Sequence, residues 1–78
     1  MNKKIKVYGV PGCPFCKRTK EFLKSKGLNF EDIDVAADHN LAKEMVEKSG
    51  QMSIPVTEID EEIVIGFDKE KIEALLRG

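Results

Sequence analysis

Apolar residues recur along this chain with two periods, one typical of strands and one typical of helices. Residues 4–9 alternate lysines with apolar side chains, which predicts a strand. From Pro14 to about Lys26 the apolar spacing becomes three and four residues, which predicts a helix that Gly27 can close in a left-handed conformation. The inward face predicted for this helix consists of Phe15, Thr19, Phe22, Leu23 and Lys26.

The rest of the chain continues to alternate strand-like and helix-like segments. They are a strand at 28–35, a helix that Asp38 or Asn40 caps and that runs to about Ser49, strands at 56–59 and 63–65, and a last helix that Asp68 caps. The first strand, helix and strand form a βαβ unit with parallel strands, and the last two strands form an antiparallel hairpin. We therefore expect a single α/β domain over 1–78, with a four-stranded mixed sheet and helices on both faces, in the order β-α-β-α-β-β-α.

Composition and charge narrow the possible functions. With 78 residues the chain has room for one small core, and its net charge of −1 argues against binding to nucleic acid. The start of the sequence is not the apolar block of a signal peptide, and no apolar run is long enough to span a bilayer. We therefore expect a cytoplasmic monomer without a membrane partner, in a compartment that keeps thiols reduced.

Both cysteines of the chain lie in the tetrapeptide from Cys13 to Cys16, between the first predicted strand and the first predicted helix. A thiol just ahead of a helix faces unpaired N–H groups and the positive end of the helix dipole, which favour the thiolate. A second thiol within the first turn is close enough to attack a mixed disulfide formed at the first. Lys17, Arg18 and Lys20 add positive charge, although each is also explained by a solvated helix face. This pattern predicts a redox centre.

Two structural explanations of the cysteines fit less well. A zinc site needs about four ligands, and the chain adds only one imidazole, His39, in a different predicted helix. A disulfide that closes so short a loop stabilises a fold by only about 2 kcal/mol in the chain-entropy model. We therefore predict no metal site.

Three motifs in register, Cys13-Pro14-Phe15-Cys16, Ser53-Ile54-Pro55 and Gly66-Phe67-Asp68, make the chain similar to the glutaredoxin family over essentially its full length. The resemblance is strongest to small bacterial glutaredoxin-like redoxins with a Cys-Pro-Phe-Cys site, including those that serve ribonucleotide reductase. It implies a thioredoxin-like fold, in which Cys13 is the nucleophile, Cys16 is the resolving thiol and Pro55 is a cis-proline.

The resemblance also implies a substrate groove beside these cysteines. Its predicted members are Tyr8, Pro14, Phe15, Gln51, Ile54, Pro55, Gly66, Phe67 and Asp68. In it, Gly66-Phe67-Asp68 resembles the segment that contacts the γ-glutamyl end of glutathione. The chain departs from glutathione-binding members at Val10, where they commonly carry Lys, at Ile65-Gly66 in place of Gly-Gly, and at Asp68-Lys69 in place of paired aspartates. These departures predict weaker binding of glutathione.

The resemblance leaves the partners open. A thiol–disulfide oxidoreductase of this type binds no cofactor and reduces a disulfide-containing protein or small molecule. It is re-reduced by glutathione or by a flavoprotein of the thioredoxin-reductase type. The alternative is a binding module that holds a metal or an iron–sulfur cluster between two subunits, as some glutaredoxins do with one active-site cysteine per subunit and glutathione. Pro14 argues against it, because such members tend to have smaller residues there.

Overall fold

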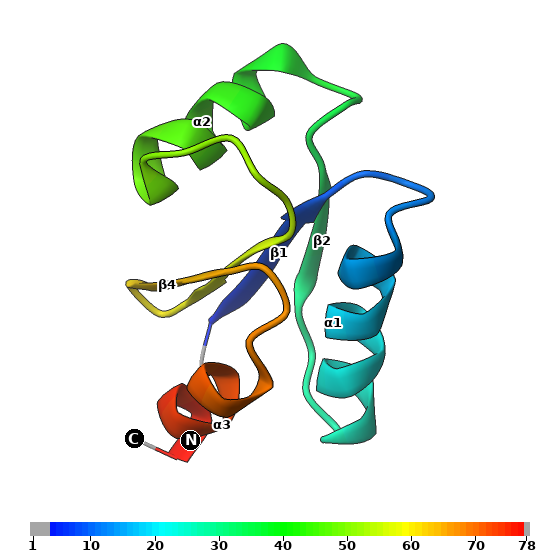
Figure 1. The fold of residues 1–78 in the computed structure, drawn as a ribbon, viewed down its shortest axis with the longest axis vertical. Helices are drawn as coiled ribbons and strands as arrows, with labels where there is room; N and C mark the ends of the chain where they lie inside the picture. Colours follow the sequence, from blue (N-terminus) through cyan, green and yellow to red (C-terminus); the bar gives the residue numbers. More distant parts are fainter. Residues whose placement is uncertain (1–3, 78) are drawn as a thin grey trace.

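The structure is a computed structural model that describes residues 4–77. Its elements follow the predicted order of strands and helices (Figure 1). They are β1 (Ile5–Gly9), α1 (Pro14–Ser25), β2 (Glu31–Asp34), α2 (His39–Ser49), β3 (Val56–Ile59), β4 (Glu62–Ile65) and α3 (Lys69–Arg77). The first three residues, at which we looked for a signal peptide, lie outside the described range.

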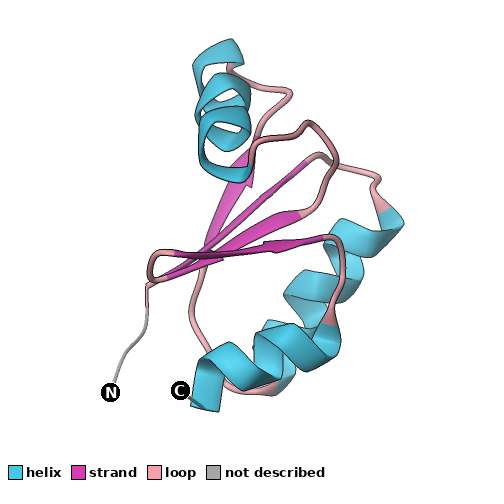
Figure 2. Cartoon of the chain, turned by 60° about the vertical axis from the view of Figure 1, so that its left-hand side comes forward, coloured by secondary structure: helices cyan, strands magenta, loops and turns pink. Residues whose placement is uncertain are grey.

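The four strands form one mixed sheet in the order β2-β1-β3-β4. β1 runs parallel to β2 and antiparallel to β3, and β3 runs antiparallel to β4, which confirms the βαβ unit and the hairpin. Figure 2 shows α2 on one face of the sheet and the other two helices on the opposite face. At one end of the sheet, the carboxyl ends of β1 and β4 therefore meet the start of β3.

Two apolar clusters fill the space between the sheet and its helices. On the α1 and α3 face the buried residues are Ile5, Val7, Leu23, Ile59, Val64 and Ile72. On the α2 face they are Tyr8, Ile33, Met45 and Val56. Alternate residues of a strand point to opposite faces, so the central strand β1 contributes to both clusters. This double burial fixes β1 as the rigid element from which the Cys13 loop departs.

The inward face of α1 differs from the prediction at both ends, since Lys26, also predicted to lie on it, is the exposed C-cap residue after Ser25. The buried residues of the helix are Cys16, Thr19 and Leu23, which follow one another at intervals of three and four. Phe15, which was predicted to face inward, is 55% exposed. The prediction at Phe15 was wrong because Cys16, one residue further on, occupies the position against the sheet.

The second strand is shorter than predicted because its first residues complete the end of α1. The N–H of Leu28 donates to the carbonyl of Leu23 (3.1 Å), and Gly27 has the positive φ of 72° that closes such a helix end. Pairing with β1 then starts only at Glu31, so residues 28–30 lead into the strand but do not belong to it.

None of the helices within 4–77 has the length and apolar character that a bilayer-crossing segment needs.

Candidate active site

Cys13 lies immediately ahead of α1, as the sequence predicted. It is the N-cap residue of the helix, with Pro14 as the first helical residue, where a missing N–H leaves no helical bond unmade. The backbone N–H of Cys16 donates to the Sγ atom of Cys13 at 3.2 Å. The sulfur of Cys13 thus takes the place that a Ser or Asp oxygen takes in an ordinary helix cap.

This position favours the thiolate of Cys13. Burial acts to raise its pKa, but the combined lowering effects outweigh burial. They are hydrogen bonds from the side chain and backbone of Cys16, a hydrogen bond from the backbone of Phe15, and the positive charge of Lys20. The pKa of Cys13 is therefore lower than the ordinary value of a thiol.

Of the three basic residues that follow the motif, Lys20 is the one whose charge lowers the pKa of Cys13. The Arg18 guanidinium lies over the Phe15 ring instead, 5.7 Å from its centroid. Lys17 remains on the exposed side of α1, and within residues 4–77 it forms no ion pair with Glu21.

Cys16 has the opposite environment. It is 1% exposed, and burial is the largest of the effects that raise its pKa to about 11. A hydrogen bond to Cys13 and the negative charge of Cys13 act in the same direction. Its sulfur lies against the backbone of Gly9. A Cβ atom added at Gly9 would be only 2.6 Å from the Cys16 Sγ. Both cysteines are free thiols in this structure. The site thus holds one accessible, acidic thiol and one buried thiol that keeps its proton.

The Ser53-Ile54-Pro55 and Gly66 segments meet at the same end of the sheet as the cysteines. Tyr8 of β1 is paired with Val56 of β3, so Pro55 comes next to the end of β1 from which the Cys13 loop departs. The Ile54–Pro55 peptide bond is cis, as the resemblance implied, and the Pro55 ring is fully buried. The N–H of Gly66 donates to the carbonyl of Pro55 at 2.8 Å and joins the two segments.

Phe67 and Asp68 continue from Gly66 into α3. The half-buried Phe67 ring meets the Phe22 ring of α1 edge to face, with centroids 6.0 Å apart. The Asp68 carboxylate accepts the N–H of Lys71 at 3.2 Å, which confirms the predicted cap of the last helix. Asp68 is otherwise exposed.

Gln51 is engaged within the loop that leads to Pro55. Its Nε2 group donates to the Ser53 carbonyl (3.1 Å) and to the Ser49 hydroxyl (3.3 Å), while its Oε1 accepts the N–H of Ser53. Both ends of the amide thus hold the loop in shape.

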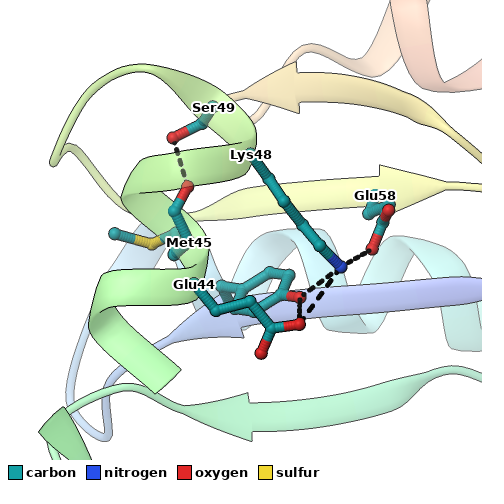
Figure 3. A network of polar contacts seen from close by, with 6 residues as sticks. Glu44, Met45, Lys48, Ser49 and Glu58 are labelled. Atoms are coloured by element: carbon teal, nitrogen blue, oxygen red, sulfur yellow. Dashed lines mark hydrogen bonds and ion pairs between the residues drawn. The ribbon is translucent and has the colours of Figure 1, made fainter. Parts of the chain in front are cut away.

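Tyr8, predicted to line the groove, is buried in the cluster against which Ile54 packs. It has no exposed surface and packs on the α2 face of the sheet. Its hydroxyl accepts from Lys48 (3.2 Å) and donates to Glu44 (3.5 Å), and Lys48 also pairs with Glu58 at 2.9 Å. Figure 3 shows Lys48 reaching from α2 to the two carboxylates. Tyr8 therefore links α2 to the sheet and offers no surface to a substrate.

Sequence reasoning missed two exposed apolar side chains near the motifs. Met52 is 80% exposed in the loop before Pro55, and Ile65 is 49% exposed directly before Gly66. Their only sequence signal is that each is a large apolar residue next to a motif loop.

Within residues 4–77 no three His, Cys, Asp or Glu side chains come together in a group that could hold a metal ion. The two thiols are thus not joined there by further metal ligands from the same chain.

The similarities to known proteins cover almost the whole chain. The glutaredoxin family model matches residues 5–64. An uncharacterised glutaredoxin-like 8.6 kDa protein in a rubredoxin operon of Clostridium pasteurianum is 47% identical over 72 residues, which are 92% of this chain and 96% of that protein.

Two solved structures extend this similarity to three dimensions. A glutaredoxin from Archaeoglobus fulgidus superposes with a TM-score of 0.89 at 34% identity, over 97% of this chain and 88% of that one. NrdH-redoxin from Escherichia coli, described as a glutaredoxin-like protein with a thioredoxin-like activity profile, superposes with a TM-score of 0.81 at 28% identity, over 92% and 93%. The expected thioredoxin-like fold is thereby confirmed.

Proposed function

Because the chain belongs to the glutaredoxin family and is a thiol–disulfide oxidoreductase, we propose that Cys13 is its attacking thiol and Cys16 its resolving thiol. The observation that carries this assignment is the contrast between the two environments. The pKa of Cys13 is lowered at an accessible helix start, whereas the pKa of the buried Cys16 is raised to about 11. The thiolate is the nucleophile in disulfide exchange, so the first attack falls to Cys13.

The proposed reaction has two exchange steps. The Cys13 thiolate attacks one sulfur of the substrate and forms a mixed disulfide, while the other sulfur leaves as a thiolate and takes a proton from water. Cys16 then loses its proton and attacks the Cys13 sulfur, which releases the second substrate sulfur and leaves a Cys13–Cys16 disulfide. The substrate gains two electrons and two protons; both electrons and the Cys16 proton come from the protein, and the other proton comes from water.

The second step follows from the first through electrostatics. The charge of the Cys13 thiolate and its hydrogen bond with Cys16 both help to raise the pKa of Cys16. A mixed disulfide at Cys13 carries no charge, so both effects weaken when Cys16 has to ionise. Cys16 therefore becomes a better nucleophile only after a substrate has been captured.

A substrate groove beside Cys13 is the second part of the proposal. The backbone of Ile54 would meet an extended substrate next to the sulfur, since the Pro55 ring itself is buried. Pro14 and Phe15 are exposed on the helix side of Cys13, and Gly66, Phe67 and Asp68 follow the far strand. Gln51 supports the loop between them through its bonds to Ser49 and Ser53.

For the reductant we favour a flavoprotein of the thioredoxin-reductase type over glutathione. Val10 provides no charge where glutathione-binding members commonly carry Lys, and the Gln51 amide is already bonded within its own loop. Neither position thus offers a positive charge or a free amide to the carboxylates of glutathione. The structural relative from E. coli is itself described as having a thioredoxin-like activity profile. The physiological substrate would be a protein disulfide, with ribonucleotide reductase as one candidate, reduced by a cytoplasmic monomer.

Two experiments test these assignments. The first compares turnover with NADPH and thioredoxin reductase against turnover with glutathione and glutathione reductase; fast turnover with glutathione alone would overturn the preferred reductant. The second compares cysteine variants by mass spectrometry. Cys13→Ser should abolish exchange, whereas Cys16→Ser should accumulate the mixed disulfide, and an active Cys13→Ser protein would contradict the role of Cys13.

A further inference from the structure

A second hollow adjoins Cys13, away from the Pro55 segment. A cavity of about 320 Å³ lies between the loop after β1, the outer side of α1 and the edge strand β2. Cys13 lines it, together with Lys17, Lys20, Glu21, Lys24 and Asp32. β2 and β3 flank β1 on opposite sides, so this cavity and the Pro55 groove lie on opposite sides of Cys13.

Apart from the Cys13 sulfur, the charged lining of the cavity consists of three lysines and two carboxylates, in a chain whose net charge is −1. Lys20 is neutralised in part, because its Nζ atom lies 3.1 Å from the Asp32 carboxylate. Lys17 and Lys24 form no ion pair or hydrogen bond through their side chains with any residue in 4–77. Glu21 lies between them on the helix, three and four residues away.

We propose that this cavity binds a carboxylate side chain close to the reacting cysteine of a peptide or protein disulfide. The carboxylate would lie between the ammonium groups of Lys17 and Lys24 while Cys13 attacks the substrate sulfur. This inference rests on the proposed role of Cys13 and specifies the substrate class of that site: disulfides with acidic neighbours.

The physical reason is the charge of the nucleophile. The Cys13 thiolate repels an acidic peptide as it approaches. The sulfur that leaves the substrate in the same step is also a thiolate, so negative charge remains at the site. Two unpaired ammonium groups beside the thiolate offset that repulsion, whereas a basic peptide would be repelled by them. Complementary charges at the rim of a contact act mainly on the rate of association. The effect should therefore appear in the second-order rate constant of the first exchange step.

The test uses three synthetic peptides that carry one cysteine as a mixed disulfide with an uncharged small thiol. The residues flanking the cysteine are Glu, Gln or Lys in otherwise identical peptides. Stopped-flow rates at low salt should be about threefold higher for the Glu peptide than for the Gln peptide, as expected for exposed ion pairs. The difference should shrink at 0.15 M salt, where the Debye length falls to about 8 Å.

Variants assign the effect to the cavity. The double variant Lys17→Gln and Lys24→Gln should remove the preference for Glu over Gln, and Glu21→Gln should increase it. Lys43→Gln removes one positive charge on the exposed side of α2, as each single Lys→Gln change in the cavity does, and should leave the preference unchanged. Equal rates for the Glu and Gln peptides in the unmodified protein would overturn the inference, as would an equal loss in the Lys43→Gln protein.

Two further arms separate this inference from the proposed function and from glutathione. If the uncharged peptide is reduced no faster by the unmodified protein than by Cys13→Ser, the proposed function itself fails. A Cys13-dependent reaction without a charge preference contradicts only the inference. If Lys17 and Lys24 matter for oxidised glutathione but not for the Glu peptide, the cavity serves glutathione and the peptide assignment is wrong.

Discussion

The contact between Gly9 and Cys16 makes a quantitative prediction for Gly9→Ala. The added Cβ atom would lie 2.6 Å from the Cys16 Sγ and 3.1 Å from its Cβ, whereas ordinary contacts begin near 3.4 Å. The sulfur would have to move by about 0.8 Å, in a site where Cys16 is 1% exposed. Overpacking of this kind costs typically about 1–3 kcal/mol.

A smaller effect of the same substitution opposes this cost. Alanine restricts the unfolded chain more than glycine does, which stabilises a fold by about 0.4–1 kcal/mol where the backbone allows it. The backbone of Gly9 does allow it, since its φ lies outside the positive range. We therefore expect a net loss of roughly 1–2 kcal/mol in the free energy of unfolding. At this chain length that corresponds to a fall in Tm of about 4–15 °C.

The assay is urea and thermal unfolding of the reduced protein, with a double-mutant cycle against Cys16→Ala. Removing the sulfur removes the closest contact, so Gly9→Ala should cost no more than a few tenths of a kcal/mol in the Cys16→Ala background, where only the 3.1 Å contact remains. An equal penalty in both backgrounds would refute the reasoning, because the cost would then come from the strand and not from Cys16. The resolving step should also slow in Gly9→Ala, because its Cys16 sulfur is displaced from the position beside Cys13.

Three more predictions concern charge. Lys20→Gln should raise the pKa of Cys13, measured as an upward shift in the pH profile of iodoacetamide alkylation; an unchanged profile would remove Lys20 from the site. Lys48→Met should lower the free energy of unfolding by about 1–2 kcal/mol through its lost bonds to Glu58 and the α2 network. Because the pKa of Lys48 is raised, its contribution to the free energy of unfolding should be fully present below the ordinary lysine pKa and should decline only as pH rises above it. If the difference in stability between the unmodified protein and Lys48→Met already fell near pH 7, this account would be wrong. Asp68→Ala should cost about 1 kcal/mol as a lost helix cap, whereas Asp68→Asn should keep the cap and slow only substrates that place a positive charge beside Asp68. Unchanged rates with such substrates in Asp68→Asn would leave Asp68 as a cap alone.

The sequence predicted most of the fold because its strong signals are local. Glycines and caps marked the element ends, so β3 over Val56–Ile59 and the end of α2 at Ser49 were predicted where the structure has them. The parallel pairing of β1 and β2 followed from the connection rule for βαβ units. The start of β2 was missed because the sequence around Leu28 suits both a strand and the end of α1, and in the structure the N–H of Leu28 bonds back to α1.

The groove was harder to predict because it depends on which way single side chains face. Tyr8 belongs to a strand that is buried on both faces, so apolar alternation gives no information about its direction. Phe15 and Cys16 are neighbours that both suit an apolar face, and the inward position is decided by the space over Gly9. Such choices depend on contacts between elements that are distant in sequence.

The asymmetry of the two thiols depends on where α1 begins. Pro14 is suited to the first helical position, so it fixes Cys13 as the cap and turns Cys16 toward the sheet three residues later. If the helix began one turn earlier, Cys13 would lose the open N–H groups that lower its pKa. Cys16 would still be buried, and neither thiol would then be a good nucleophile at neutral pH. The charge of Lys20 in the next turn lowers the pKa of Cys13 further, but the position of the Cys13 sulfur is set by the helix start. The direction of the proposed exchange, from Cys13 first to Cys16 second, is thus determined by backbone geometry before any charged side chain contributes.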